Sequence, residues 1–270
     1  MRAALAYEWV RVRSIRSTWW LTGIAVAIGL LIALGFAWGG AAEIADQPRP
    51  TAQDRTLLGP LLVSSAAAVG APCLIGFVLA MIGVFAWGHE YRHGMIRASL
   101  TALNSRGCLW LAKFGLTGAW VALVSFLVML AAGAIGWLFL HEYGVPVFTA
   151  RTWGLIGREV VYVVVLTWLA MAFTALTRSQ AFALVMIFLW PLLVENVIRV
   201  IFQTVPRLSD HAELVRFLPF NAGGRMLNVI EHPDGLFGTP LSAAGGFIVF
   251  GGLAAVLMVV SWVLLQRRDA

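Results

Sequence analysis

Six apolar stretches dominate this sequence, and each has the roughly 20 residues that a helix needs to cross the hydrocarbon core of a bilayer. A membrane interior offers no water to backbone N–H and C=O groups, so only helices and closed barrels cross it. Barrel strands alternate in polarity, whereas these stretches are continuously apolar. We therefore expect an all-α membrane protein with six transmembrane helices in a single transmembrane domain, residues 1–270. The expected spans are Trp19–Trp38, Leu57–Trp87 with a kink at Pro72, Phe114–Leu140, Val160–Leu176, Ala181–Phe202 and Ala244–Leu265.

The composition argues against several other classes of protein. Of the 270 residues, 60% are apolar and 12% are charged, whereas soluble domains have about 45–50% and about 25%. The net charge of +6 could indicate nucleic-acid binding, but the arginines lie in short clusters between apolar stretches, as topology signals do. Lys113 is the only lysine and Phe114 follows it, so the chain lacks the phosphate-binding motif GxxxxGK[ST]. We expect contact with the lipid bilayer and no binding of nucleic acid or, through that motif, of ATP.

Clusters of basic residues predict the orientation in the membrane. Cytoplasmic loops carry an excess of Lys and Arg, and long loops obey this rule weakly. The rule predicts that both termini are cytoplasmic, even though a long loop after the fifth stretch also carries arginines. The residues expected on the cytoplasmic side are Arg2, Arg11, Arg13, Arg16, Arg92, Arg97, Arg106, Lys113, Arg178, Arg267 and Arg268.

Three segments are expected outside the apolar stretches: a cytoplasmic N-terminal helix over 1–18, a cytoplasmic connector over 88–113 and an extracytoplasmic connector over 204–243. The first is basic and loosely amphipathic, and its arginines can reach anionic lipid head groups. We expect Leu5, Trp9 and Val12 to share its apolar face. The third contains two short apolar patches, which lie on the membrane or dip back into it.

One motif suggests a different function. His89–His93 match HExxH, which on a helix places two histidines beside one Zn²⁺ ion and a glutamate as general base. Intramembrane metalloproteases with six helices exist, and some use a distal aspartate like the one in His232–Gly235 (HPDG). Under the predicted orientation, however, the two motifs lie on opposite faces of the membrane and cannot share one ion. We expect no metal site, and an intramembrane zinc protease stays an alternative.

Four motifs in order resemble one family. Residues 8–20 (EWVRVRSIRSTWW) resemble the opening EWxKLRSxRSTWW of the actinobacterial ABC-2 type permeases, the membrane subunits of ABC transporters. Residues 90–100 (EYRHGMIRASL) resemble their EYRHGTIRxTL connector. Residues 178–181 followed by 190–195 (RSQA and WPLLVE) are similar to the turn between the fourth and fifth helices of the family and to its fifth helix. Residues 217–224 (FLPFNAGG) are similar to its outer connector.

The resemblance implies a bacterial plasma-membrane exporter with two permease subunits, identical or different, and two copies of a separate ABC ATPase subunit. ATP and Mg²⁺ would be bound by the ATPase, and this chain would hold no cofactor and catalyse no reaction. The connector would contain the coupling helix that docks on the ATPase. Its charges at a water-facing helix end and its apolar anchor suit that role. The residues expected to contact the ATPase are Glu90, Arg92, His93, Met95, Ile96 and Arg97.

The fifth apolar stretch contains an acidic residue, Glu195, about 21 Å from Ala181 along the helix. An ionisable residue inside a membrane is a candidate functional site. Glu195 would belong to a translocation path, or it would form an intramembrane ion pair with Arg199, in the favourable i,i+4 order.

The transported substrate is not predicted by these features. A non-transporting anchor or sensor that recruits an ATPase through the same fold is a further alternative to the exporter.

Overall fold

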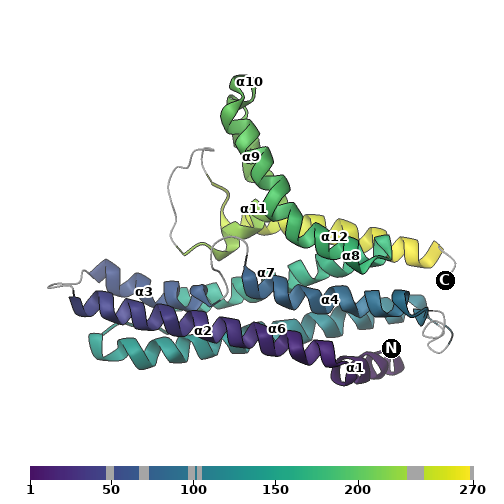
Figure 1. Ribbon diagram of the computed structural model, residues 1–270, viewed down its shortest axis with the longest axis horizontal. Coiled ribbons are helices and arrows are strands. Elements are labelled where there is room, and N and C mark those ends of the chain that lie inside the picture. The colour runs from purple at the N-terminus through teal and green to yellow at the C-terminus, as the bar shows by residue number, and fades with distance from the viewer. Residues whose placement is uncertain (47–51, 67–72, 97–100, 102–104, 230–239, 268–270) are drawn as a thin grey trace.

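The computed structural model describes the chain except residues 47–51, 67–72, 97–100, 102–104, 230–239 and 268–270 (Figure 1). Within the described ranges the chain forms helices and no strand, which confirms the all-α class. Six helical segments there are long and apolar enough to cross a membrane, as predicted. Their helices are α2 (Arg16–Asp46), α4 (Leu74–Arg92), α6 (Arg106–Leu140), α7 (Ala150–Thr177), α8 (Gln180–Leu189) continued by α9 (Glu195–Thr204), and α12 (Ala243–Arg267).

The shorter elements connect these spans. The described ones are α1 (Arg2–Ser14), α3 (Ala52–Ser65), η1 (His141–Tyr143), η2 (Trp190–Val194), α10 (Pro206–Ser209), η3 (Ala212–Phe217), α11 (Pro219–Gly224) and η4 (Arg225–Leu227).

Polar side chains fix where the spans begin. The side chains of Cys73, Ser105, Thr149 and Ser179 each accept a hydrogen bond from a backbone N–H of the first turn of α4, α6, α7 and α8. Such caps satisfy donors that have no partner within the helix.

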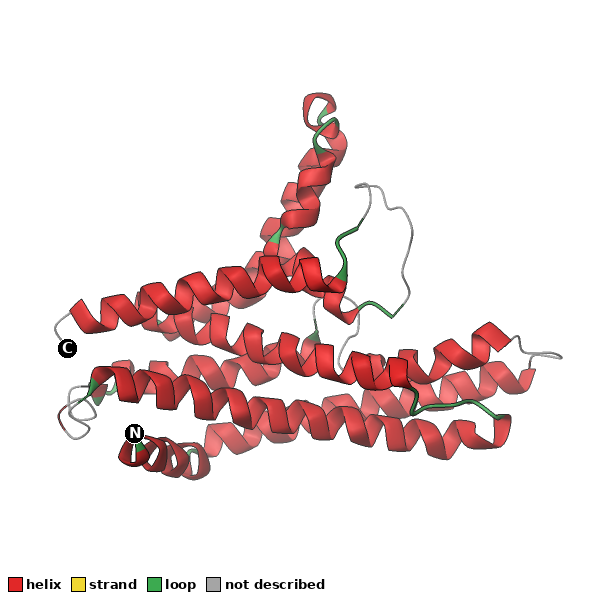
Figure 2. Cartoon of the chain, turned by 180° about the vertical axis from the view of Figure 1, so that it is seen from behind, coloured by secondary structure: helices red, strands yellow, loops and turns green. Residues whose placement is uncertain are grey.

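The core of the molecule is a bundle in which α2, α4, α6 and α7 run side by side (Figures 1 and 2). Glycines allow α4 to lie close to α7. A Cβ atom on Gly83 would come within 2.8 Å of side-chain atoms of Thr167 and Met171. Small residues at helix contacts are typical of membrane proteins, because they permit dense packing of the backbones.

The second expected span is wrong in its extent. One span with a kink or a bent entry was expected over Leu57–Trp87, but helix α3 ends at Ser65 and α4 begins at Leu74 as a separate helix. Only α4 is long enough to be a candidate span. The kink expected at Pro72 lies outside the described residues.

The fifth span bends sharply. Pro191 lies in the π-helical turn η2, after which α9 and α10 leave the bundle (Figures 1 and 2). Proline lacks a backbone N–H, and π-turns and prolines are common causes of helix kinks. The span expected over Ala181–Phe202 is therefore present as two helices joined by a bend.

The connector after α10 packs back against the bundle. Helix α11 contacts α12, and η4 contacts α7. Phe220, Met226 and Leu227 from the two predicted apolar patches are buried in the protein core. These three residues pack against other helices, whereas Leu214 and Phe217 of the first patch (Leu214–Phe220) are exposed. Contact of the patches with the membrane stays a prediction.

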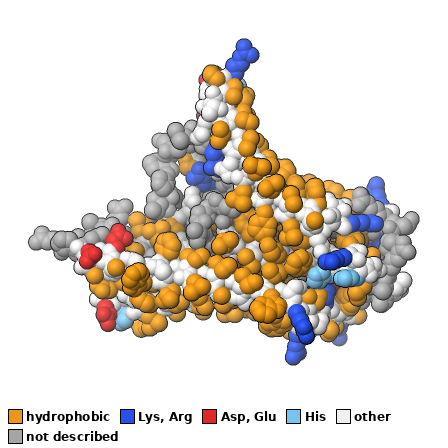
Figure 3. Space-filling model, in the orientation of Figure 1, with side chains coloured by type: hydrophobic (Ala, Val, Ile, Leu, Met, Phe, Trp, Pro, Cys, Tyr) orange, Lys and Arg blue, Asp and Glu red, His pale blue; other side chains and the backbone are white. Residues whose placement is uncertain are grey.

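The two ends of the bundle carry opposite charge. Both termini lie at one end (Figure 1), where Figure 3 shows basic side chains, and acidic side chains lie at the other end. We call these the Arg-rich end and the acidic end. The Arg-rich end contains Arg2, Arg13, Arg16, Arg92, Arg106, Arg178 and Arg267, and the acidic end contains Glu43, Asp46 and Glu142.

Candidate functional site

Four charged side chains meet inside the protein at the Arg-rich end, and we call them the Lys113 cluster: Glu8, Arg11, Glu90 and Lys113. The Lys113 Nζ atom lies 2.6 Å from Glu8 Oε1 and 2.6 Å from Glu90 Oε1. Arg11 pairs with the other oxygen of Glu8. The cluster therefore joins three elements, since Glu8 and Arg11 lie on α1, Glu90 on α4 and Lys113 on α6.

Lys113 is fully satisfied, whereas Arg11 Nη2 and Glu90 Oε2 are buried without a hydrogen-bond partner in the described structure. The ammonium group of Lys113 has three donors, and it reaches two carboxylates and the carbonyl oxygen of Ala86, at 3.2 Å. It also lies 5.1 Å from the centre of the Trp87 ring. Two positive and two negative charges balance. Removing one partner from a buried ion pair typically costs about 3–5 kcal/mol, because it leaves an uncompensated charge.

These positions correct two expectations. Glu90 is not a water-facing contact for an ATPase, since it is only 3% exposed, and Lys113 is fully buried rather than part of a solvated loop. The face of the N-terminal helix also differs from the expected one. The buried residues of α1 are Ala4, Glu8 and Val12, whereas Leu5 and Trp9 are exposed. Glu8 turns inward because Lys113 provides its counter-charge there.

A tight turn follows α4 and exposes part of the connector. Gly94 has φ of 65°, and the N–H of Met95 donates to the carbonyl of Glu90 at 2.9 Å. This is a Schellman motif, which glycine favours because it adopts a left-handed conformation without strain. Of the expected coupling residues, Arg92, His93 and Met95 are exposed, Ile96 is buried against Trp110 and its neighbours, and Arg97 lies outside the described residues.

The HExxH motif lies at this same helix end. Glu90, the general base of the protease alternative, instead binds Lys113. The ring of His89 stacks on Phe85, with 5.2 Å between the ring centres. Within the described parts of the chain, no three His, Cys, Asp or Glu side chains form a group that could hold a metal ion. His232–Gly235 lie outside those parts.

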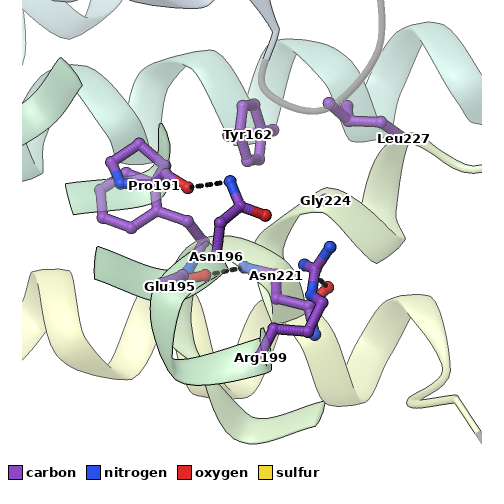
Figure 4. Close-up of a pocket in the computed structure, with 9 residues that line it drawn as sticks. Tyr162, Pro191, Glu195, Asn196, Arg199, Asn221, Gly224 and Leu227 are labelled. Atoms are coloured by element: carbon purple, nitrogen blue, oxygen red, sulfur yellow. Dashed lines mark hydrogen bonds between the residues drawn. The ribbon is translucent and has the colours of Figure 1, made fainter. Parts of the chain in front are cut away.

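A second polar site surrounds Glu195 near the bend of the fifth span. The two carboxylate oxygens of Glu195 accept hydrogen bonds from the backbone N–H groups of Phe220 and Asn221, both at 2.8 Å (Figure 4). Arg199 donates to the side-chain oxygen of Asn221 at 3.3 Å. Glu195 thus binds the first turn of α11, a pair of partners that the sequence pattern does not reveal.

This site couples the bend to the connector. The Asn196 amide donates to the carbonyls of Pro191 and Leu192, which lie in the bend (Figure 4). Through Glu195, the same helix α9 holds α11. The cavity beside these groups has a volume of about 70 Å³ and is lined by Tyr162 among others. It has room for water molecules but not for a large substrate. The hydrogen bonds of Glu195 therefore hold α9 and α11 together rather than line a path for a large molecule.

Glu159 is a buried carboxylate that the sequence analysis missed. It lies on α7 just before the expected span Val160–Leu176, and it is fully buried. Neither of its oxygens has a hydrogen-bond partner in the described structure. Its spacing from Tyr162, Val163 and Leu166 places it on the buried face of α7, and this periodicity is the signal that could have identified it.

The chain was compared with known proteins. No protein-family model matches it, and no curated protein is found to match it.

Proposed function

We propose that this chain is the permease subunit of a bacterial ABC-2 type exporter in the plasma membrane. A separate ATPase subunit, in two copies, binds and hydrolyses ATP at the cytoplasmic face. Two permease subunits form the path, and the chain itself carries out no covalent chemistry. Six apolar helical segments, with both termini at the Arg-rich end, support a multi-pass protein of this kind.

The observation that carries this proposal is the exposed turn after α4. Arg92, His93 and Met95 project from a turn whose backbone is held by two hydrogen bonds, Gly94 to Tyr91 and Met95 to Glu90. The Lys113 cluster ties this helix end to α1 and α6. A force applied to the turn therefore reaches two other helices. A coupling element needs both an exposed docking surface and a stiff connection to the spans.

The projecting helix α9 supports a second permease subunit. The exposed side chains on α9 and its bend are largely apolar, and they stand away from the bundle (Figure 1). An exposed apolar helix face requires a protein or lipid partner, and we propose a second permease subunit as that partner. The exposed residues are Leu192, Leu193, Val197, Val200 and Ile201.

The test is co-purification with an ABC ATPase co-expressed from the gene beside that of the permease. Arg92→Glu and Met95→Asp should each weaken the complex at matched expression, because a reversed or buried charge disrupts docking. The loss should be about tenfold or more in the amount of ATPase retained, since truncating a buried contact of this kind costs about 2–5 kcal/mol. Both variants should still insert, because Arg92 is the last residue of α4 and Met95 lies after it, so neither lies in the apolar part of a span.

Arg207→Glu is the matched control, since Arg207 is exposed on α10, outside the Arg-rich end. It should leave ATPase assembly unchanged. Full retention of the ATPase by both connector variants would contradict the docking assignment. ATP-driven transport in vesicles then separates an exporter from a non-transporting anchor, which would bind the ATPase but move no cargo.

A further inference from the structure

A groove with a volume of about 670 Å³ runs between α2 and α3 on the outside of the bundle. Its walls are apolar side chains of both helices, Phe36 and three leucines of α3 among them. Its floor includes Gly35 and Gly39, one helical turn apart. Among the described residues that line it, only Glu43 is charged, and it lies one turn further along α2, toward the acidic end.

The two floor glycines face open space. A Cβ atom on Gly35 or Gly39 would find no heavy atom within 4 Å, whereas one on Gly29 of the same helix would come within 2.6 Å of Ile75 and Val128. Gly29 thus serves helix packing, whereas Gly35 and Gly39 leave space in the groove. From Ile32 to Glu43 the groove follows α2 for about 16 Å, at 1.5 Å per residue.

Glu43 gives the groove a charge preference. No Lys or Arg forms an ion pair with it in the part of the chain that the structure describes. Asp46 and Glu142 lie at the same end of the molecule, and Figure 3 shows acidic side chains there. Glu43 is itself exposed, and the apolar walls beside it lower the local dielectric constant on one side, which strengthens its attraction for a cation bound in the groove.

We propose that this groove binds an amphiphile with an alkyl chain and a cationic head group. The chain lies over Gly35 and Gly39, and the head group pairs with Glu43. A helix of a second copy fits less well, because it would bury Glu43 against an apolar surface without a counter-charge, which is costly. An anionic lipid would be repelled by the carboxylate. The inference deepens the proposed function, because it names the chemical class of a cargo, although the binding itself requires no ATPase.

The experiment uses the purified full chain in nanodiscs of zwitterionic lipid. Binding of radiolabelled dodecyltrimethylammonium is measured by scintillation proximity, with dodecyl sulfate and dodecyl maltoside as competitors that share its chain. The cationic amphiphile should bind about three- to tenfold more tightly than either competitor, the range of a partly desolvated ion pair. Glu43→Gln should abolish this preference. Gly39→Leu should weaken binding of all three at least about tenfold, because its side chain fills the groove.

Two matched controls accompany these variants. Gly23→Leu adds the same side chain to α2 at another open position, and Glu142→Gln removes an exposed carboxylate at the same end. Neither should change binding. Equal competition by the three head groups, or unchanged binding by Gly39→Leu, would overturn the proposal. A shift of Gly39→Leu from dimer to monomer with unchanged binding would instead identify the groove as a subunit contact. The exporter proposal fails on a different readout, the retention of the ATPase by connector variants.

Discussion

At the scale of single residues, the role of a charged side chain in this protein depends on the groups that pair with it. Lys113 carries the same charge as the arginines that predict topology, yet it is fully buried between two carboxylates. Glu195 and Glu159 are both buried glutamates, but only Glu195 has hydrogen-bond partners among the described residues. Burial of a polar group is costly unless its hydrogen bonds are replaced, so these two carboxylates should affect stability in opposite directions.

Substitution of each glutamate by methionine, an apolar residue of similar length, tests this contrast. Glu159→Met should raise the free energy of unfolding by about 1–3 kcal/mol, because it removes an unpartnered buried polar group. Glu195→Met should lower it by a similar amount, because the N–H groups of Phe220 and Asn221 lose their acceptor. Thermal unfolding of the purified chain in detergent measures both. A lower midpoint for Glu159→Met would mean that the carboxyl group has a partner in the native membrane protein.

At the scale of helices, hydropathy predicted the number of spans but not their internal breaks. A stretch of apolar residues can be buried in lipid or in protein, and hydropathy does not distinguish the two. The stretch Leu57–Trp87 therefore looked like one span, although α3 ends at Ser65 and Cys73 caps α4. The bend at Pro191 was likewise hidden by a continuously apolar stretch. Local sequence also could not show that α1 buries Glu8, since the reason is Lys113, 105 residues away.

The residues expected to contact an ATPase divide in the same way. Arg92 at the end of α4, and His93 and Met95 after it, are exposed as the sequence predicted, and their role in docking stays a prediction. The sequence misplaced Glu90, whose partner comes from another helix. Side chains whose role depends on a distant helix were thus the ones that local patterns could not assign.

The packing of α4 on α7 provides a test at this scale. Gly83→Ala should lower the free energy of unfolding by about 1–3 kcal/mol, because the new Cβ atom would come within 2.9 Å of the backbone oxygen of Thr167. Gly115→Ala on α6 is the control, since no heavy atom lies within 4 Å of that position. It should raise stability by about 0.5–1 kcal/mol, as alanine replaces glycine in a helix. Equal effects of the two substitutions would show that α4 and α7 do not pack this closely.

At the scale of the whole molecule, the separation of charge between the two ends bears on both proposals. Six spans place both termini on one side of the membrane whichever way the protein inserts. The excess of arginine at that end then favours the cytoplasm. The exporter proposal needs this orientation, because the turn after α4 must face an ATPase supplied with cytoplasmic ATP. The groove proposal holds in either orientation, and the orientation decides only which leaflet Glu43 faces.

Thiol labelling of intact cells tests the orientation. Cys108 lies at the start of α6, at the Arg-rich end, and is partly exposed, whereas Cys73 is buried. Cys108 should react with a membrane-permeant maleimide but not with an impermeant one. Glu142→Cys in a Cys108→Ser background should react with both, because Glu142 is exposed at the acidic end. The reverse pattern would place the turn after α4 outside the cell, beyond the reach of any ATPase, and would turn Glu43 toward the cytoplasm. It would therefore overturn the exporter assignment and move the amphiphile groove to the inner leaflet.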